Sequence, residues 1–248
     1  MFTVDTYTPT RVIFGAGRLE ELASVKLPGT KALICVTADG LMEKIGVQQR
    51  VLDLLAKNNV EAAIFSDITP NPNRETVMAA AALAEREGCD FFIGLGGGSS
   101  IDVAKATAII AKNGGDLWDY AEVGSGGRKP VQVAAPIITI ATTCGTGTET
   151  DQYCVITKEE TAEKIDFTMD ALFPTLSIID PELMVSPLST SGCPKRWRMA
   201  PTWRRARIWP MAQTFWGDMR WRTASSRPIT SSARPWVGCS PRFRTAPP

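Results

Sequence analysis

The fold is decided by the stretch Phe91-Phe92-Ile93-Gly94-Leu95-Gly96-Gly97-Gly98-Ser99-Ser100-Ile101-Asp102, in which an apolar strand leads through three glycines into a helix. Glycine lets the backbone approach a ligand closely, and the first turn of the helix presents free N–H groups and the positive end of the helix dipole. This arrangement favours a phosphate group. The alternative is a tight turn with Ser99 or Ser100 as the N-cap. The spacing matches neither GxGxxG nor a P-loop, so this stretch alone leaves both interpretations open.

The alternation of strand and helix continues on both sides of this stretch. Short apolar runs at residues 32–36, 60–65, 91–95 and 133–140 alternate with helical patterns at residues 41–57, 74–87 and 101–112. This alternation indicates parallel strands covered on both faces, with the loops after the strands gathered at one edge of the sheet. Three loops, at residues 37–40, 94–100 and 142–148, are therefore expected to converge on one ligand.

The last of these loops is rich in hydroxyl groups and glycine. It reads Thr142-Thr143-Cys144-Gly145-Thr146-Gly147-Thr148-Glu149 and follows an apolar strand directly. Such a loop supplies donors and space for a polar ligand. Its alternative interpretation is a glycine-rich turn whose threonines bond to the backbone.

Composition and charge divide the chain near residue 190. Residues 1–190 carry 15 Lys/Arg and 25 Asp/Glu, whereas residues 191–248 carry 12 and one, which gives net charges of −10 and +11. The second part also contains six of the seven Trp residues and no Leu, a mixture that does not build an ordinary core. We expect residues 188–248 to be disordered.

The chain is expected to be a cytoplasmic protein with reduced thiols. Its start has no basic and apolar signal pattern, and no apolar segment is long enough to span a membrane. The six cysteines show no CxxC spacing, so free thiols are expected rather than disulfides.

Several motifs in a fixed order resemble the iron-containing alcohol dehydrogenase family, which is related to glycerol dehydrogenase and dehydroquinate synthase. The motifs are Arg11-Val12-Ile13-Phe14-Gly15-Ala16-Gly17, Pro70-Asn71-Pro72, Gly96-Gly97-Gly98-Ser99 with Asp102 and Lys105, Asp116-Leu117-Trp118-Asp119-Tyr120, the loop 142–149, and Ile179-Asp180-Pro181-Glu182-Leu183. The resemblance implies an NAD(P)-binding α/β domain at residues 1–187, with a parallel Rossmann-like sheet flanked by helices. It also implies hydride transfer between NAD(P) and a primary alcohol or aldehyde.

The resemblance assigns cofactor contacts to individual residues. The diphosphate would be bound by Gly96, Gly97, Gly98 and Ser99. The adenine and diphosphate side would be lined by Thr142 and Thr143, with Thr146 in the same loop, and the adenosine would lie near Asn71. The nicotinamide ribose would lie towards Asp102 and Lys164. Three of these have plain alternatives: Lys164 as a solvated lysine, Asp102 as a first-turn acid, and Asn71 as a turn residue.

The choice between NAD and NADP depends on the end of the first apolar run. NAD-selective relatives often place an Asp two residues after the strand-ending Val, where this chain has Ala38 followed by Asp39. A carboxylate there bonds the ribose 2′-hydroxyl and repels a 2′-phosphate. Asp39 is expected to substitute if the turn shifts, so NAD is preferred and NADP stays open.

The metal chemistry of the family has no counterpart in this sequence. The resemblance implies Fe²⁺ or Zn²⁺ held in a second, helical domain by an Asp and three His, but the chain contains no histidine, and Asp218, Cys193 and Cys239 are scattered. No catalytic residue and no metal ligand is therefore assigned. We expect a member of the alcohol dehydrogenase family whose dehydrogenase activity is lost in this chain, and the alternative is a non-catalytic nucleotide-binding fragment. A homo-oligomer is compatible with the sequence.

Two hypotheses account for residues 188–248. The Arg, Trp and Pro of this segment are what GC-rich codons for Ala, Leu and Gly encode one base out of frame, which predicts that another frame of the coding DNA restores a helical, histidine-bearing continuation. The lesser alternative is binding of single-stranded nucleic acid through Arg and Trp, although no nucleic-acid-binding fold is visible.

Overall fold

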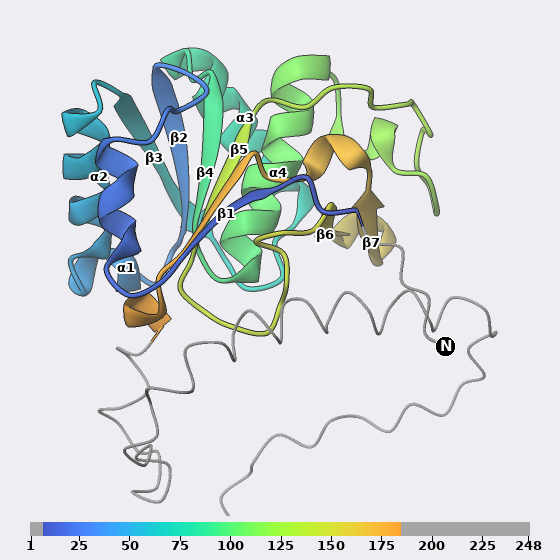
Figure 1. Ribbon diagram of the computed structural model, residues 1–248. Coiled ribbons are helices and arrows are strands. Elements are labelled where there is room, and N and C mark those ends of the chain that lie inside the picture. The colour runs from blue at the N-terminus through green and yellow to red at the C-terminus, as the bar shows by residue number, and fades with distance from the viewer. Residues whose placement is uncertain (1–6, 185–248) are drawn as a thin grey trace, which may run out of the picture.

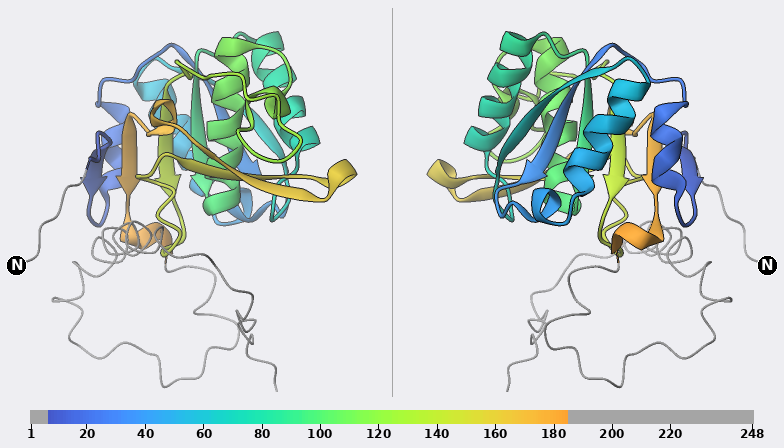
Figure 2. Two further views of the ribbon diagram at one scale, coloured as in Figure 1. Left: turned by 90° about the vertical axis from the view of Figure 1, so that its right-hand side faces the viewer. Right: turned by 90° about the vertical axis from the view of Figure 1, so that its left-hand side faces the viewer.

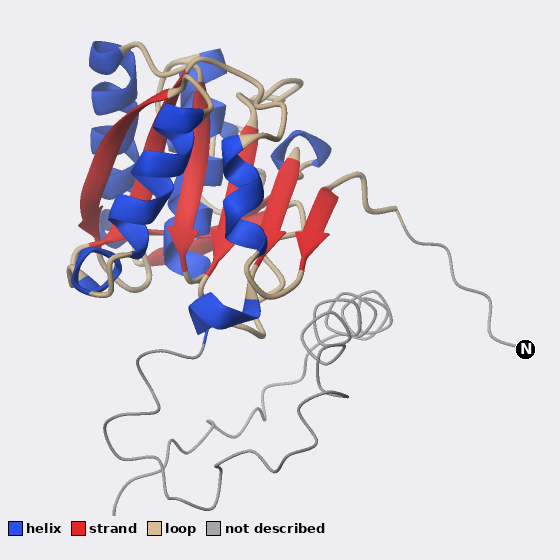
Figure 3. Ribbon diagram, turned by 60° about the vertical axis from the view of Figure 1, so that its left-hand side comes forward, coloured by secondary structure: helices blue, strands red, loops and turns tan. Residues whose placement is uncertain are grey.

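The computed structural model describes residues 7–184, which form a six-stranded parallel sheet with helices on both faces (Figure 1). The strand order is β1–β8–β5–β4–β2–β3. The strands are β1 (Arg11–Phe14), β2 (Lys31–Thr37), β3 (Glu61–Ile68), β4 (Phe91–Gly96), β5 (Ile137–Ala141) and β8 (Leu176–Ile179). In Figure 3 the arrowheads of these strands point to one edge, so the loops that follow them lie together.

Consecutive residues of a strand point to opposite faces of the sheet. Since consecutive residues of β2 are apolar and buried, both faces must be covered, and helices cover them. On β2, Ala32, Ile34 and Val36 pack under the 3₁₀ helix η1 (Arg18–Ala23) and α2 (Val47–Lys57), whereas Leu33 and Cys35 face the opposite side. That opposite side is covered by α3 (Arg74–Glu87) and α4 (Gly98–Asn113), and Figure 2 shows the two helix layers edge-on.

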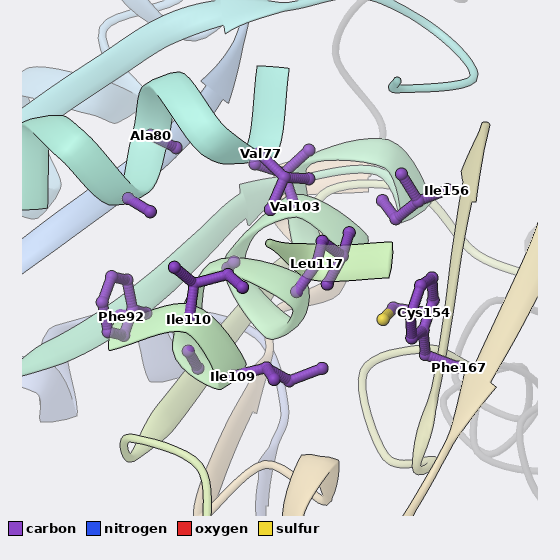
Figure 4. Close-up of a cluster of buried hydrophobic side chains, with 14 of the residues drawn as sticks. Val77, Ala80, Phe92, Val103, Ile109, Ile110, Leu117, Cys154, Ile156 and Phe167 are labelled. Atoms are coloured by element: carbon purple, nitrogen blue, oxygen red, sulfur yellow. The ribbon is translucent and has the colours of Figure 1, made fainter. Parts of the chain in front are cut away.

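An antiparallel hairpin of β6 (Tyr153–Lys158) and β7 (Glu163–Thr168) adds to the core beside α4. Its buried side chains, among them Cys154, Ile156 and Phe167, pack with Val103 of α4 and Leu117 (Figure 4). Leu117 starts the 3₁₀ helix η2 (Leu117–Tyr120), and the remaining short helices are α1 (Leu41–Lys44), η3 (Glu159–Thr161), η4 (Asp170–Leu172) and η5 (Pro181–Met184). The tip of the hairpin projects from the body of the domain (Figure 2).

The structure confirms the predicted parallel α/β class and changes three of the predicted elements. The helix expected at residues 41–57 is interrupted, because Gly46 has a left-handed φ of 76° that ends one helix and precedes the next. The strand expected from residue 133 begins at Ile137, since Pro136 has no N–H to pair with a neighbouring strand. The helix expected from residue 101 begins three residues earlier, at Gly98.

The expectations for thiols and membrane segments have separate outcomes. Cys35, Cys89, Cys144 and Cys154 are free thiols, whereas Cys193 and Cys239 lie outside the described residues. Within residues 7–184, no helix has the length and apolar character needed to cross a bilayer. The predicted domain boundary at 187/188 and the tail beyond it also lie outside the described part of the chain.

Candidate nucleotide-binding site

The glycine loop lies where the central strand β4 becomes α4. Gly96 has a φ of 143°, a conformation that side-chain-bearing residues rarely adopt, and Gly97 follows in an extended conformation as the N-cap of α4. Among residues 7–184, no side chain caps this helix, so the alternative interpretation with Ser99 or Ser100 as the N-cap is wrong. The N-terminus of a 16-residue helix is therefore left without a side-chain acceptor, which suits an anionic ligand.

The loop after β5 packs directly against the glycine loop. The Thr142 N–H donates to the Gly96 carbonyl at 2.9 Å, which continues the pairing of the two strands. A Cβ atom on Gly97 would lie 3.2 Å from the Thr143 hydroxyl oxygen, and one on Gly98 would lie 3.3 Å from a methyl of Thr146. The structure thus brings together the two loops that the sequence predicts to share a ligand, and it places Thr143 and Thr146 exposed beside the glycines.

Asp102 lies one turn into α4 and is partly buried under the same loop. Its carboxylate accepts hydrogen bonds from the Thr148 hydroxyl at 2.9 Å and from the Val155 N–H at 3.4 Å. Burial raises the pKa of Asp102 to about 6, against the opposing effects of the Thr148 hydrogen bond and the positive charge of Lys105. Asp102 is thus poised to change charge just below neutral pH, unlike an ordinary first-turn acid.

Asn71 and Lys164 form an exposed pair at the hairpin. The Lys164 ammonium donates to the Asn71 side-chain oxygen at 2.7 Å, although 93 residues separate them. Asn71 has a φ of 57°, which is consistent with a turn residue. The roles predicted from the sequence, Asn71 near the adenosine and Lys164 towards the nicotinamide ribose, stay predictions, and the structure adds that the two side chains are in contact.

Asp39 follows β2 and directly precedes Gly40, the N-cap of α1. Its carboxylate accepts from the Thr37 hydroxyl at 2.9 Å and from the Leu41 N–H at 3.0 Å, and the hydrogen bond from the Leu41 N–H contributes most to holding the pKa of Asp39 below its usual value. A hollow of about 190 Å³ adjoins this turn and is lined by Thr37, Ala38 and Ser66 among others. Asp39 is exposed and lies in the same turn as these lining residues, at the carboxyl edge of the sheet, but is not itself one of them.

Comparison with known proteins assigns this architecture to a family. The sequence profile described as iron-containing alcohol dehydrogenase matches residues 9–181. The chain belongs to this family. It is 35% identical over 180 residues to the NAD-dependent methanol dehydrogenase of Bacillus methanolicus, an alignment that covers 72% of this chain and 46% of that relative.

Solved structures agree with the assignment. NADH-dependent butanol dehydrogenase A from Thermotoga maritima superimposes with a TM-score of 0.68 at 34% identity, covering 75% of this chain and 46% of that one. Sulfoacetaldehyde reductase from Bifidobacterium kashiwanohense in complex with NAD+ gives 0.66 at 31% identity, covering 75% and 48%. The chain thus matches less than half the length of these relatives.

The described residues do not fit the metal centre that the family name implies. The chain contains no histidine, and among residues 7–184 no three Cys, Asp or Glu side chains are grouped as metal ligands.

The sequence analysis gave no role to the side chains that connect the two loops. Lys105 is fully buried and contacts Thr148 and Asp151. The signal was present, because a lysine within the apolar helix Ile101-Asp102-Val103-Ala104-Lys105-Ala106 requires buried partners. Those partners follow β5 or begin β6, and helical periodicity does not identify them.

Proposed function

We propose that residues 1–187 bind nicotinamide adenine dinucleotide across the carboxyl edge of the sheet. The observation that carries this proposal is the N-terminus of α4, which has no side-chain cap from the described part of the chain and is packed against the threonine loop at Gly97 and Gly98. Free N–H groups at a helix start, bare backbone and neighbouring hydroxyls together match a diphosphate.

The remaining contacts follow from this placement. The backbone of Gly96, Gly97, Gly98 and Ser99 would bind the diphosphate, with Thr142, Thr143 and Thr146 along its other side. Asp102 would accept from a hydroxyl of the nicotinamide ribose, because an ionised carboxylate is a strong acceptor. Lys164 and Asn71 would meet the ligand as one pair, since their side chains are joined at 2.7 Å.

We expect NAD+ to bind more tightly than NADP+. The Asp39 carboxylate would accept from a ribose 2′-hydroxyl and repel a 2′-phosphate, a difference of about tenfold in the dissociation constant.

Calorimetric titration of the full chain with both dinucleotides tests the nucleotide site itself and this preference together. Asp39→Asn keeps the acceptor for the Leu41 N–H and removes the charge, so it should reduce the NADP+ disadvantage to about threefold or less.

Asp53→Asn is the matched control for this substitution. Asp53 is an exposed acid on α2, away from the glycine loop, so removing its charge should leave the ratio of the two affinities unchanged. Equal affinities of the unchanged chain for NAD+ and NADP+ would show that Asp39 does not discriminate between the two dinucleotides. Failure of both dinucleotides to bind would overturn the proposed function.

We propose that the reaction for which this nucleotide site evolved is hydride exchange between NAD and a primary alcohol or aldehyde. The relatives named for methanol and butanol support this class of substrate. The 248-residue chain, however, contains none of the histidines that the family resemblance calls for. We therefore propose that the chain itself is a nucleotide-binding protein without alcohol dehydrogenase activity.

This proposal predicts oxidation of methanol, ethanol and butanol at the background rate. The assay follows NADH absorbance with the purified full chain and with added Fe²⁺ or Zn²⁺, at dinucleotide concentrations that saturate the site in the titration. Because binding is measured separately, absence of turnover is not confused with absence of cofactor. Sustained turnover above that of an enzyme-free control would contradict the proposal.

A further inference from the structure

One fully buried ammonium group connects α4 to the loop that follows β5. The Lys105 Nζ lies 2.8 Å from both the carbonyl oxygen and a carboxylate oxygen of Asp151, 2.9 Å from the Tyr153 carbonyl and 3.2 Å from the Thr148 hydroxyl. Its side chain has no exposed surface. A buried cation requires such partners, so the position of this loop relative to α4 is tightly constrained.

The lysine also fixes the direction of the hydrogen bond made by Thr148. A lysine ammonium has three N–H groups and only donates, so two of the four acceptors share one N–H group. The Thr148 oxygen, at 3.2 Å, can only accept from it, which leaves the single hydroxyl proton for another acceptor. That acceptor is Asp102, whose carboxylate oxygen lies 2.9 Å away. Lys105 and Asp102 are three residues apart on α4 and lie on the same side of the helix, with Thr148 bridging them.

Both carboxylate oxygens of Asp102 accept a hydrogen bond within the domain. Thr148 donates to one of them and the Val155 N–H to the other at 3.4 Å, and since a carboxylate oxygen can accept more than one hydrogen bond, acceptor capacity is left for a ligand. The ionisable groups around it are Lys105 on its own helix, Asp151 in the loop and Cys154 on β6. Burial raises the pKa of the Cys154 thiol well above its ordinary value, so this thiol stays neutral while Asp102 titrates.

We propose that Lys105, acting through the Thr148 hydroxyl, is a positioning residue that aims the Asp102 carboxylate at the nicotinamide ribose. This inference rests on the proposed dinucleotide site and adds the residues that align one of its contacts. The alternative is a purely structural connection, in which Lys105 secures the loop without affecting any particular part of the ligand.

Thr148→Val tests the proposal with little change in shape. The variant removes the hydroxyl but leaves Lys105 its contacts with Asp151 and Tyr153. In the full chain we expect NAD+ to bind about tenfold more weakly, because the carboxylate is no longer oriented, while ADP, which lacks the nicotinamide ribose, changes by less than about twofold. Thr148→Ser restores the hydroxyl and should return NAD+ binding to within about twofold of the unchanged chain.

Thr107→Val is the matched control. Thr107 is a buried threonine on the same helix whose hydroxyl has no hydrogen-bond partner among the described residues, so both ligands should bind it as they bind the unchanged chain. Equal losses of NAD+ and ADP in Thr148→Val would support the structural alternative and overturn the inference, as would unaltered NAD+ binding. If the unchanged chain binds no NAD+, the proposed function itself fails and the inference falls with it.

A pH series supplies a second readout that loosening of the loop would not produce. Only the ionised form of Asp102 lacks a proton of its own and accepts at both oxygens, so NAD+ affinity should fall as the pH decreases through the Asp102 pKa of about 6. Loss of the Thr148 hydrogen bond raises that pKa further, so the midpoint should move to higher pH in Thr148→Val. ADP is left out of this series because its terminal phosphate itself takes up a proton near pH 6. A midpoint for NAD+ that is the same in both chains contradicts the inference.

Discussion

A Gly97→Ala chain is expected to fold and to bind NAD+ about 30-fold more weakly, a loss of about 2 kcal/mol that corresponds to one charge-assisted hydrogen bond. Gly97 has φ −86° and ψ −168°, an extended conformation that alanine adopts without strain. The added methyl would point at the Thr143 hydroxyl, 3.2 Å away, and so into the junction of the two loops where we place the diphosphate. The ligand phosphates would then be kept from the N–H groups of α4.

The control for this variant is Gly114→Ala, at the opposite end of the same helix. Gly114 has a φ of 67° and a ψ of −164°, and a Cβ there would meet nothing within 4 Å. Because this backbone region is adopted almost solely by glycine, alanine at Gly114 costs about 3 kcal/mol of stability but leaves the nucleotide site intact. Calorimetric titration of both variants separates the two effects. Affinities that agree within error between Gly97→Ala and the unchanged chain would remove the glycine loop from the proposed site.

A Gly94→Ala chain is expected to lose about 3 kcal/mol of unfolding free energy, the upper part of the range for overpacking a tight interior. Gly94 lies in β4, between Cys35 of β2 and Thr139 of β5. A Cβ on Gly94 would lie 2.7 Å from the Cα atom of Ile101 and 2.9 Å from its Cγ1. Because the nearer atom is helix backbone, no side-chain rotation relieves the contact, and α4 must move away from the sheet.

Thermal unfolding followed by circular dichroism checks this expectation. For a domain of this size a loss of that magnitude lowers the Tm by roughly 6–12 °C. Gly88→Ala is the comparison, because Gly88 follows α3 with a φ of 67° and has open space around it, so it should cost only the strain of about 1 kcal/mol. Equal Tm values for the two variants would mean that the packing of α4 on β4 is looser than the structure indicates.

The sequence predicted those features of the site that are made by residues close together in the chain, and it missed those made by residues far apart. The strand through Leu95, the glycine turn and α4 are adjacent in the chain, and their pattern predicted the fold and the loop at which we propose the ligand. The alternative with a serine as the N-cap rested on the common preference for serine at that position, yet the structure gives the N-cap to Gly97. Local preference yields there to the turn that β4 must make at Gly96, whose φ of 143° excludes most other residues.

The hairpin of β6 and β7 shows the opposite case. Its segments carry an alternating pattern, but nothing in the local pattern says that Cys154 and Phe167 pack beside α4. The contact between Lys164 and Asn71 depends on this placement and was not predicted from the sequence: the Lys164 ammonium donates to the Asn71 side-chain oxygen across 93 residues.

The sequence by itself determined a parallel α/β domain, the glycine loop after its central strand and the edge at which the loops meet, because hydrophobic periodicity and glycine act over a few neighbouring residues. Only the tertiary structure decided that Lys105 is buried against Asp151, 46 residues away, and that Thr148 bridges it to Asp102. Such contacts form when a buried charge finds its partners among segments brought together by packing, and no local pattern specifies which segments those are.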